Sequence, residues 1–296
     1  MGPLIDAGLV GGSFLVAIVV GLTGMGGGAL MTPMMMLFFN VPPLAAVSSD
    51  LVASAVMKPV GSVVHLRRGT VNLRLVGWLC AGSVPTAFCG VFLARAFAVT
   101  DAVKYALGVA LLLAVAGMAF KSWLGGRGGS SSTHEIVVRP IPTLLVGMVG
   151  GLIVGVSSVG SGSLIIVALL ALYPALKANQ LVGTDLVQAV PLVASAALGH
   201  LMFGDFQMDL TLSLLIGSIP GVYLGARISS RAPGGLIRAM LAIVLLASAL
   251  KLLDASNTLT LWALAAAVVV TVAGWRIKVR AAARESRENT DLEPAR

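Results

Sequence analysis

Long runs of apolar residues, separated by short breaks rich in glycine, proline or charge, occupy most of this chain. The breaks divide it into two sets of five segments, followed by one further segment. Continuous apolar runs are typical of membrane-spanning helices, whereas a membrane barrel would alternate apolar and polar positions. The pattern therefore predicts an all-α polytopic membrane protein. The expected segments are 4–22, 27–39, 42–66, 72–96 and 101–121 in the first set, 141–158, 162–173, 177–202, 208–228 and 235–253 in the second, and 258–275 after them.

These segments predict the division of the chain into larger parts. We expect a first transmembrane repeat at 1–124 and a second at 140–254. Between them, residues 125–139 are rich in Gly and Ser, which is typical of a flexible cytoplasmic linker. An extra transmembrane helix at 255–276 and a polar cytoplasmic tail at 277–296 would complete the chain.

The composition agrees with a membrane protein and limits its partners. The chain is 57% hydrophobic and 11% charged, with a mean hydropathy of +0.98 and a net charge of +8. Basic residues gather in short loops and in the tail, so the charge indicates the cytoplasmic side of a lipid bilayer and not nucleic acid. The sequence has no nucleotide-binding loop. It has 3 histidines and no clustered Cys or Glu residues that could join them as metal ligands, so we expect no metal site and no cofactor. We expect the protein in the cell (inner) membrane. The sequence leaves open whether it forms a homo-oligomer.

Two stretches 135 residues apart match in sequence, and the matched positions include polar and acidic residues, which are the least favourable in a membrane interior. Ser49-Asp50-Leu51-Val52 aligns with Thr184-Asp185-Leu186-Val187. A duplicated unit that holds an intramembrane acid indicates a transport pathway between two related halves. The other matched pairs are His65 and His200, Gly69 and Gly204, Gly82 and Gly217, Pro85 and Pro220, Gly90 and Gly225, and, at an offset of 134, Gly21 and Gly155, Gly26 and Gly160, Gly28 and Gly162, and Leu30 and Leu164.

The first two segments of each set form either one broken helix or a helical hairpin. A continuous helix over residues 4–39 would be about 54 Å long, which exceeds an apolar core of about 30 Å. Loop charge favours the hairpin, because it places 16 basic residues on one side of the membrane and 3 on the other, against 12 and 7 for the broken helix. We therefore expect two inverted repeats, with the N-terminus outside and the C-terminus in the cytoplasm. The 16 are Arg67, Arg68, Arg74, Lys121, Arg127, Arg139, Lys177, Arg227, Arg231, Arg238, Arg276, Lys278, Arg280, Arg284, Arg287 and Arg296, and the 3 are Arg95, Lys104 and Lys251.

The glycine-rich breaks are the first candidates for a binding site. Each is followed by an apolar helix, whose N-terminus carries unpaired N–H groups and the positive end of the helix dipole. Two such termini meeting in mid-membrane would form an anion site, although close helix packing also explains glycine and serine at these positions. The candidate substrate-binding residues are Thr23, Gly24, Gly26, Gly27, Gly28, Ser49, Ser157, Ser158, Gly160, Ser161, Gly162, Thr184 and Gln188.

Two aspartates lie at matched positions inside apolar helices. Asp50 lies about 12 Å into the helix that we expect to begin at Pro42-Pro43, and Asp185 lies at a similar depth in its own helix. An aspartate at the bilayer centre costs about 2.5–3.5 kcal/mol, so its presence twice indicates a proton acceptor, a cation ligand or a partner to a base. The alternative is an acid near a helix start whose N-cap is Ser48 or Ser49.

The remaining candidates for ion coupling or a proton relay are Lys58, His65 and His200. Lys58 follows Asp50 by eight residues, too far for an ion pair within one helix. It would therefore reach Asp185, face an anionic substrate or extend to an interface. The two histidines lie near the ends of their helices, where they could relay protons or cap the last turn.

The doubled order of these motifs resembles the sulfite exporter TauE/SafE family of membrane permeases over roughly residues 8–254. The resemblance implies export or uptake of small sulfur-containing anions such as sulfite or organosulfonates, with the glycine turns and the Ser/Thr-Asp positions as the substrate region. Many members of the family have Gly-Thr-Ser at the latter positions, where this chain has Asp50 and Asp185; this departure points to a coupling ion or another substrate. The resemblance rests on residues 21–28 with Pro33, on Ser48-Ser49-Asp50-Leu51 and Gly183-Thr184-Asp185-Leu186, on His65 and His200 with Gly69 and Gly204, and on the matched Gly82, Pro85, Gly90 and Gly217, Pro220, Gly225.

The main prediction is an ion-gradient-coupled secondary transporter of a small, sulfur-containing anion, working by alternating access at the interface of two inverted repeats. The alternative is a cation or metal-ion transporter with Asp50 and Asp185 as ligands. An intramembrane hydrolase with Ser161 and His200 is disfavoured, because the matched His65 has no serine partner in the first half. We therefore expect no enzyme and no catalytic residues.

Overall fold

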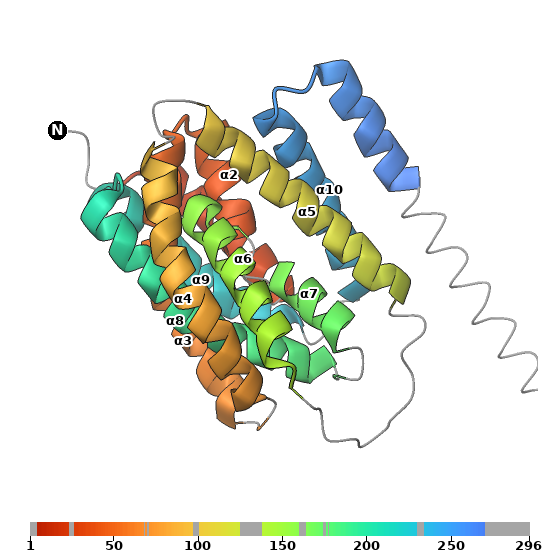
Figure 1. Ribbon diagram of the computed structural model, residues 1–296. Helices are drawn as coiled ribbons and strands as arrows, with labels where there is room; N and C mark the ends of the chain where they lie inside the picture. Colours follow the sequence, from red (N-terminus) through yellow and green to blue (C-terminus); the bar gives the residue numbers. More distant parts are fainter. Residues whose placement is uncertain are drawn as a thin grey trace, which may run out of the picture. The chain divides into compact units, whose positions relative to one another are not determined.

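The computed structural model is helical throughout the residues that it describes, which are 5–23, 27–67, 69, 71–96, 101–124, 138–159, 164–173, 176, 178–229 and 234–269, joined by short turns. The helices α1 to α10 belong to one compact unit, Met1–Leu253, and a helix at Asn257–Val269 belongs to a second unit, Asp254–Arg296. The helices of the first unit, most of which are labelled in Figure 1, are α1 (Ala7–Thr23), α2 (Gly28–Phe38), α3 (Pro43–Arg67), α4 (Leu73–Ala96), α5 (Ala102–Leu124), α6 (Pro140–Ser157), α7 (Leu164–Leu172), α8 (Ala178–Phe203), α9 (Met208–Ser229) and α10 (Gly234–Leu252).

Several of these helices have the length and composition of membrane spans. Among the described residues, five stretches are long and apolar enough to cross a bilayer: Leu73–Ala96, Ala102–Ala119, Pro140–Ser157, Gly183–Phe203 and Met208–Gly225. The apolar stretches in α1, α2, α10 and Asn257–Val269 are shorter. The predicted all-α, multi-pass class is confirmed. The expected linker at 125–139 lies outside the described residues except for its last two positions, and the expected tail at 277–296 lies wholly outside them.

The first two helices of each set run antiparallel. In the second set, the Tyr173 hydroxyl just after α7 lies 2.6 Å from the Thr143 hydroxyl in the first turn of α6, and Ile165 at the start of α7 faces Gly150 farther along α6. In the first set, Phe39 after α2 faces Gly8 at the start of α1. The chain therefore turns back between α1 and α2, and again between α6 and α7, as a helical hairpin does.

The long helices α3 and α8 also run antiparallel and contact each other along their length. The Ser48 hydroxyl near the start of α3 lies 2.8 Å from Nδ1 of His200 near the end of α8. The second half of α3 contacts the first half of α8, where the Ser62 hydroxyl donates to the Leu186 carbonyl at 2.8 Å. The residues between these two contacts lie at the α3–α8 interface.

Glycines allow two pairs of helices to approach closely. On α4, Gly82 and Gly90 lie against the backbone of α6, where a Cβ added to Gly90 would be 2.8 Å from the Leu152 carbonyl oxygen. On α9, Gly217 and Gly225 lie in the same way against the backbone of α1. Small residues at helix interfaces let membrane helices pack by van der Waals contact and without a hydrophobic driving force. The matched glycines of the two sets thus serve close helix packing.

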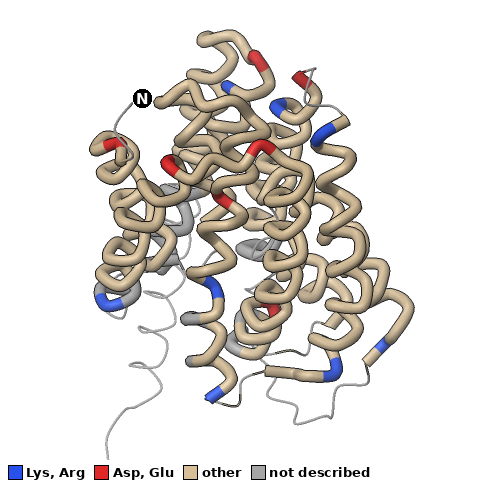
Figure 2. Tube along the Cα trace, turned by 90° about the vertical axis from the view of Figure 1, so that its left-hand side faces the viewer, with Lys and Arg blue, Asp and Glu red and all other residues tan. Residues whose placement is uncertain are grey.

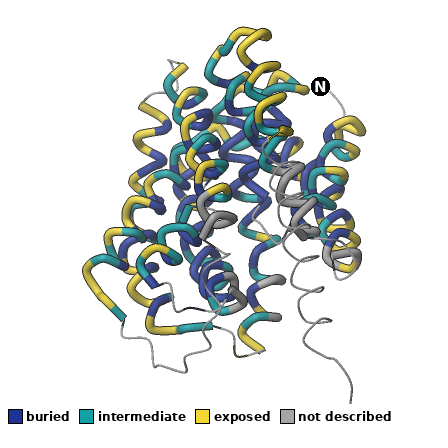
Figure 3. Tube along the Cα trace, turned by 90° about the vertical axis from the view of Figure 1, so that its right-hand side faces the viewer, coloured by how far each residue is buried: buried dark blue, intermediate teal, exposed yellow. Residues whose placement is uncertain are grey.

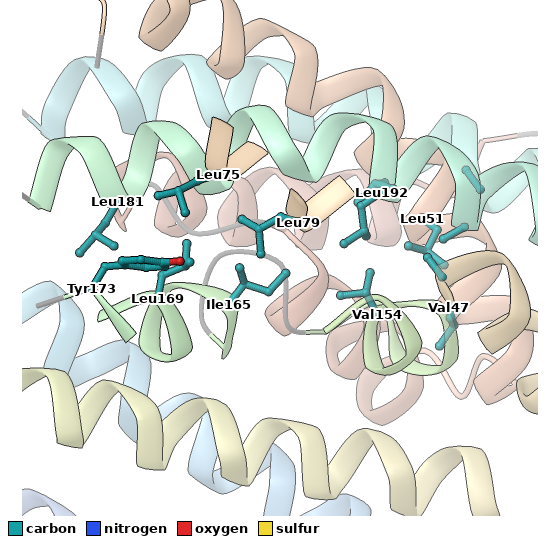
Figure 4. Close-up of a cluster of buried hydrophobic side chains, with 14 of the residues drawn as sticks. Val47, Leu51, Leu75, Leu79, Val154, Ile165, Leu169, Tyr173, Leu181 and Leu192 are labelled. Carbon is teal, nitrogen blue, oxygen red and sulfur yellow. The ribbon is translucent and has the colours of Figure 1, made fainter. Parts of the chain in front are cut away.

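Apolar side chains fill the space between the helices of Met1–Leu253. Figure 3 shows that buried positions are concentrated in the inner helices and that exposed positions lie on the outer faces. In the cluster drawn in Figure 4, side chains from α3, α4, α6, α7 and α8 point toward one another, with Leu75 and Leu79 of α4 close to Ile165 of α7. The outward-facing leucines, valines and aromatics are those expected to contact lipid acyl chains.

Charged residues are rare in the middle of the helices. Figure 2 shows most Lys, Arg, Asp and Glu positions near helix ends, with largely uncharged stretches between them. Asp50, Asp185 and Lys58 are exceptions, because each is buried inside a helix with at most 9% of its surface exposed. Because α3 begins at Pro43, Ser48 and Ser49 lie within the helix, and the alternative in which one of them caps it was wrong.

Candidate functional site

Asp50 lies where three helices meet. Its Oδ2 accepts a hydrogen bond from the Ser158 hydroxyl at 2.6 Å and another from the Thr32 hydroxyl at 3.0 Å. Thr32 lies in the second turn of α2, and Ser158 is the residue that ends α6. The carboxylate of Asp50 therefore joins α3 to α2 of the same set and to the end of α6 of the other set, through one neutral hydroxyl donor on each.

The two chain breaks meet beside this carboxylate. Gly28, the first residue of α2, lies so close to Ser158 that an added Cβ would be 2.9 Å from the Ser158 carbonyl carbon. Ser158 itself has a left-handed backbone with φ of 59°, which lets the chain leave α6 and costs a non-glycine residue about 1 kcal/mol or more. Position 28 therefore requires glycine, because any side chain there would push the start of α2 away from Ser158 at the end of α6.

A polar face of α3 extends from Asp50 toward Asp185. Asp50, Ser54 and Lys58 follow one another at intervals of four residues, so they lie on one side of the helix, and all three are buried. Lys58 lies one turn before Ser62, whose hydroxyl donates to the residue after Asp185. The Lys58 ammonium is attracted by both carboxylates, and more strongly by Asp185 than by Asp50.

Gln188, which lies one turn after Asp185 in α8, has an incompletely bonded amide. Its Nε2 donates to the Ser83 hydroxyl of α4 at 2.9 Å, while its Oε1 is buried and receives no hydrogen bond from the part of the chain that the structure describes. Turning the amide over would let Oε1 accept from Ser83 and would leave Nε2 unbonded instead. Either way, one buried amide atom remains to bind a polar ligand, since an unsatisfied polar group costs about 1–3 kcal/mol.

The two matched histidines have different surroundings. His200 is fully buried, with Nε2 donating to the Gly155 carbonyl of α6 at 2.8 Å and Nδ1 at 2.8 Å from the Ser48 hydroxyl. Nε2 carries a proton, because a carbonyl only accepts, and the Ser48 hydroxyl beside Nδ1 also donates to the Leu44 carbonyl at 2.7 Å. His65 is only partly buried near the end of α3. His200 thus joins α8 to α3 and α6, whereas the matched His65 is more exposed.

Some of the predicted substrate-binding residues hold loops in place. The Ser49 hydroxyl donates to the Gln207 carbonyl before α9, and the Thr184 hydroxyl accepts from the Asn72 amide before α4. Ser157 bonds within its own turn. Gly27 is buried next to α2, with Ser54 nearby. Of the others, Gly24, Gly26, Gly160, Ser161 and Gly162 lie outside the described residues, as does the side chain of Thr23.

Three polar side chains of this region, Thr32, Ser54 and Ser83, were missed by sequence reasoning. Thr32 and Ser54 have no polar match at the repeat offset, so no repeated pattern marked them. Ser83 does have a match, Ser218, and both are fully buried, so the repeat could have identified it. The contacts of these hydroxyls depend on which helices pack together, so the sequence pattern alone does not reveal them.

The arrangement is suited to binding small ions inside the bundle. It combines hydroxyls, an amide, two carboxylates and one ammonium group at an interface between helices. Among the described residues, no group of three or more His, Cys, Asp or Glu side chains is placed to hold a metal ion. Buried ionisable residues in membrane helices mark substrate and ion pathways.

The fold and this buried polar region define a multi-pass membrane protein of the transporter class. The chain matches the family model described as "Sulfite exporter TauE/SafE" over residues 9–252, and it belongs to this family. It is thus a member of a family of transporters and not of enzymes.

Curated relatives support the same class. The chain is 36% identical over 245 residues to "Probable membrane transporter protein YjnA" of Bacillus subtilis (strain 168), a match that covers 80% of this chain and 96% of that protein. It is 24% identical over 223 residues to "Probable membrane transporter protein YdhB" of the same organism, with 74% of this chain and 89% of that protein covered. A shorter match, 42% over 79 residues, is to "Probable membrane transporter protein YunE", and covers 26% and 27% of the two chains. No solved structure matches.

Proposed function

We propose that this protein is an ion-gradient-coupled secondary transporter of a small, sulfur-containing anion such as sulfite or an organosulfonate. The observation that carries the proposal is the meeting of two chain breaks, Gly28 against Ser158, beside the buried Asp50. Substrate and coupling-ion sites of many secondary transporters lie at discontinuous helices between two repeats. Membership in the sulfite exporter TauE/SafE family supports the substrate class.

Alternating access would occur between two inverted repeats, at 1–124 and 140–254. The helices matched at the repeat offset, α3 and α8, run antiparallel, as inverted repeats require. The contacts between the sets are also reciprocal, because α4 lies on α6 and α9 lies on α1 through matched glycines. This reciprocity supports a two-fold relation in which each half closes against the other around the polar region.

The amide of Gln188 is the best-placed donor for the anion. Turned so that Oε1 accepts from Ser83, it directs its N–H groups to a ligand. Lys58 lies on the neighbouring helix and would favour a negative charge at the same level.

Uptake of ³⁵S-sulfite into proteoliposomes tests the proposal. We expect saturable uptake that falls about tenfold or more in Gln188→Ala, since one hydrogen bond to a charged group is worth about 1.5–3 kcal/mol. The matched control is Gly77→Ala on α4, where nothing lies within 4 Å of the added Cβ. Vesicles loaded with a metal-sensitive dye test the alternative of a cation or metal-ion transporter; saturable metal flux without any sulfite or sulfonate flux would refute the anion proposal.

The proposed orientation places the N-terminus outside and the C-terminus in the cytoplasm. It is supported by the basic residues, of which 16 would lie on the cytoplasmic side and 3 outside. A reporter inserted between residues 125 and 139 should be cytoplasmic. A reporter that labels from the external side would contradict this orientation.

A further inference from the structure

The two buried aspartates are matched in sequence but differ in what surrounds them. Asp50 accepts hydrogen bonds from two hydroxyls of other helices, Thr32 and Ser158. At the repeat offsets, Thr32 matches the apolar Ile166 and Val167, and Ser158 matches Thr23 and Gly24. Asp185 is instead the stronger electrostatic partner of Lys58. The two carboxylates therefore have different tasks.

The buried charges of the described helices do not balance. Asp50 and Asp185 share a single buried cationic side chain, Lys58, which lies two turns from Asp50 along α3 and one turn from Ser62, whose hydroxyl bonds to the residue after Asp185. His200 is committed to a carbonyl and a hydroxyl, and no charged side chain bonds to it in the contacts above. Burying an ion without a counter-charge is expensive, and binding an anionic substrate would add a further negative charge. One more positive charge is needed, and Asp50 is where it would be most stabilising.

The atoms around Asp50 are oxygens of the kind that bind small, hard cations. They are the carboxylate, the two hydroxyls that now donate to it, and the carbonyl end of α6 at Ser158. The last carbonyls of a helix lack intrahelical partners and carry the negative end of its dipole, so they favour a cation. Hydroxyls can rotate their hydrogens away and present lone pairs to an ion.

We propose that Asp50, Thr32 and Ser158, with the carbonyl end of α6, form the binding site of one Na⁺ ion. A single carboxylate suits a monovalent ion, whereas a divalent ion would usually need more negative ligands. A proton would need only one oxygen, but three helices supply oxygens here. The Asp185–Lys58 pair stays as an internal ion pair beside the anion. This inference rests on the proposed function, because Na⁺ is the coupling ion of that transport cycle.

Binding of ²²Na⁺ to the purified full-length protein, without any anion, tests the site directly. We expect saturable binding that unlabelled Na⁺ displaces and that choline does not. Thr32→Val, which keeps the shape of the side chain and removes the hydroxyl, should weaken binding about fivefold or more, and Thr32→Ser should restore it. Thr143→Val is the matched control, because Thr143 is equally buried but bonds to Tyr173.

Further variants distinguish the two aspartates. Asp50→Asn should abolish ²²Na⁺ binding, and the double variant Asp185→Asn with Lys58→Met should retain it, because that change removes both charges of the pair. The reverse pattern would overturn the assignment. If Asp50→Asn fails to fold, the Thr32→Val and Thr32→Ser pair decides; equal binding by these two variants also overturns the site. Absence of saturable ²²Na⁺ binding to the unmodified protein overturns it outright.

Transport separates this inference from the proposed function. An inward Na⁺ gradient should accelerate ³⁵S-sulfite uptake into proteoliposomes, and the acceleration should be lost in Thr32→Val. Sulfite uptake that responds to a proton gradient and not to Na⁺ would overturn the Na⁺ site and leave the anion transporter standing. Na⁺ binding as described, without any sulfite or sulfonate uptake, would instead overturn the proposed function.

Discussion

The close contact between α4 and α6, and the matching contact between α9 and α1, can be tested with single methyl groups. A Cβ added to Gly90 would lie 3.0 Å from the Cα of Gly155, and one added to Gly225 would lie 3.0 Å from the Cα of Gly21. Ordinary van der Waals contact begins at 3.4 Å, and the nearest atoms are closer still: the Leu152 carbonyl oxygen would lie 2.8 Å from the Cβ added to Gly90, and the Ile18 carbonyl oxygen would lie even nearer to the Cβ added to Gly225. Backbone cannot rotate away as a side chain can, so the two helices must separate.

The expected magnitude follows from comparison with an open position. Gly→Ala within a helix gains up to about 1 kcal/mol of intrinsic propensity wherever it occurs. Gly77→Ala on α4 should show this gain alone, because nothing lies within 4 Å of its Cβ. Crowding costs about 1–3 kcal/mol, so Gly90→Ala and Gly225→Ala should each be less stable than Gly77→Ala by about that amount.

The assay is the apparent Tm of the purified protein in nanodiscs, measured at one scan rate for all three variants. If the reciprocal packing is right, Gly90→Ala and Gly225→Ala both lower the apparent Tm, Gly225→Ala at least as much as Gly90→Ala because its added Cβ meets a carbonyl oxygen more closely, and Gly77→Ala leaves the Tm unchanged or raises it. A Gly225→Ala protein as stable as Gly77→Ala would refute the reasoning, because the matched glycines would then differ in their surroundings.

Three other changes have defined outcomes. Tyr173→Phe should lower the free energy of unfolding by about 1–3 kcal/mol, measured as a drop in apparent Tm, because it leaves the Arg139 N–H without its partner and removes one of the two hydrogen bonds of the Thr143 hydroxyl; an unchanged Tm would contradict the α6–α7 hairpin contact. Gln188→Leu should maintain or raise the apparent Tm while sulfite uptake falls, since the buried Oε1 is unsatisfied; a large loss of stability would contradict a ligand-facing amide. A double-mutant cycle of Ser48→Ala and His200→Ala should show a coupling energy of about 1 kcal/mol between α3 and α8, whereas additive effects on stability would argue against their hydrogen bond.

Much of the helical framework could be predicted from local pattern. The expected segments 72–96 and 208–228 differ by only a residue or so from α4 and α9, because apolar runs bounded by Pro, Gly and charge mark both ends of such helices. The start of α3 was predicted at Pro42-Pro43, which places Asp50 in the helix interior as observed. The choice between a broken helix and a hairpin could be argued only indirectly, from loop charge.

The candidate site was predictable only in part. Asp50, Asp185 and Gln188 were identified, because polar residues are conspicuous in apolar helices. Thr32 and Ser54 were not, because hydroxyls are common in membrane helices and these two have no repeated partner. Ser49 and Thr184 were expected in the substrate region, yet their hydroxyls contact Gln207 and Asn72 in the loops before α9 and α4.

The amino-acid pattern alone determined that this chain is helical, membrane-spanning and duplicated, because those properties depend on local hydrophobicity and on the repetition of residues along the chain. Only the tertiary structure decided that the matched aspartates have unlike neighbours. Asp50 meets two hydroxyls, one of them at the end of α6, whereas Asp185 lies next to Leu186, which bonds to Ser62 one turn beyond Lys58. Such differences depend on which helices pack against each other. Asp50 and Ser158 are more than one hundred positions apart, so their contact is set by the packing of whole helices and not by the residues next to them in sequence.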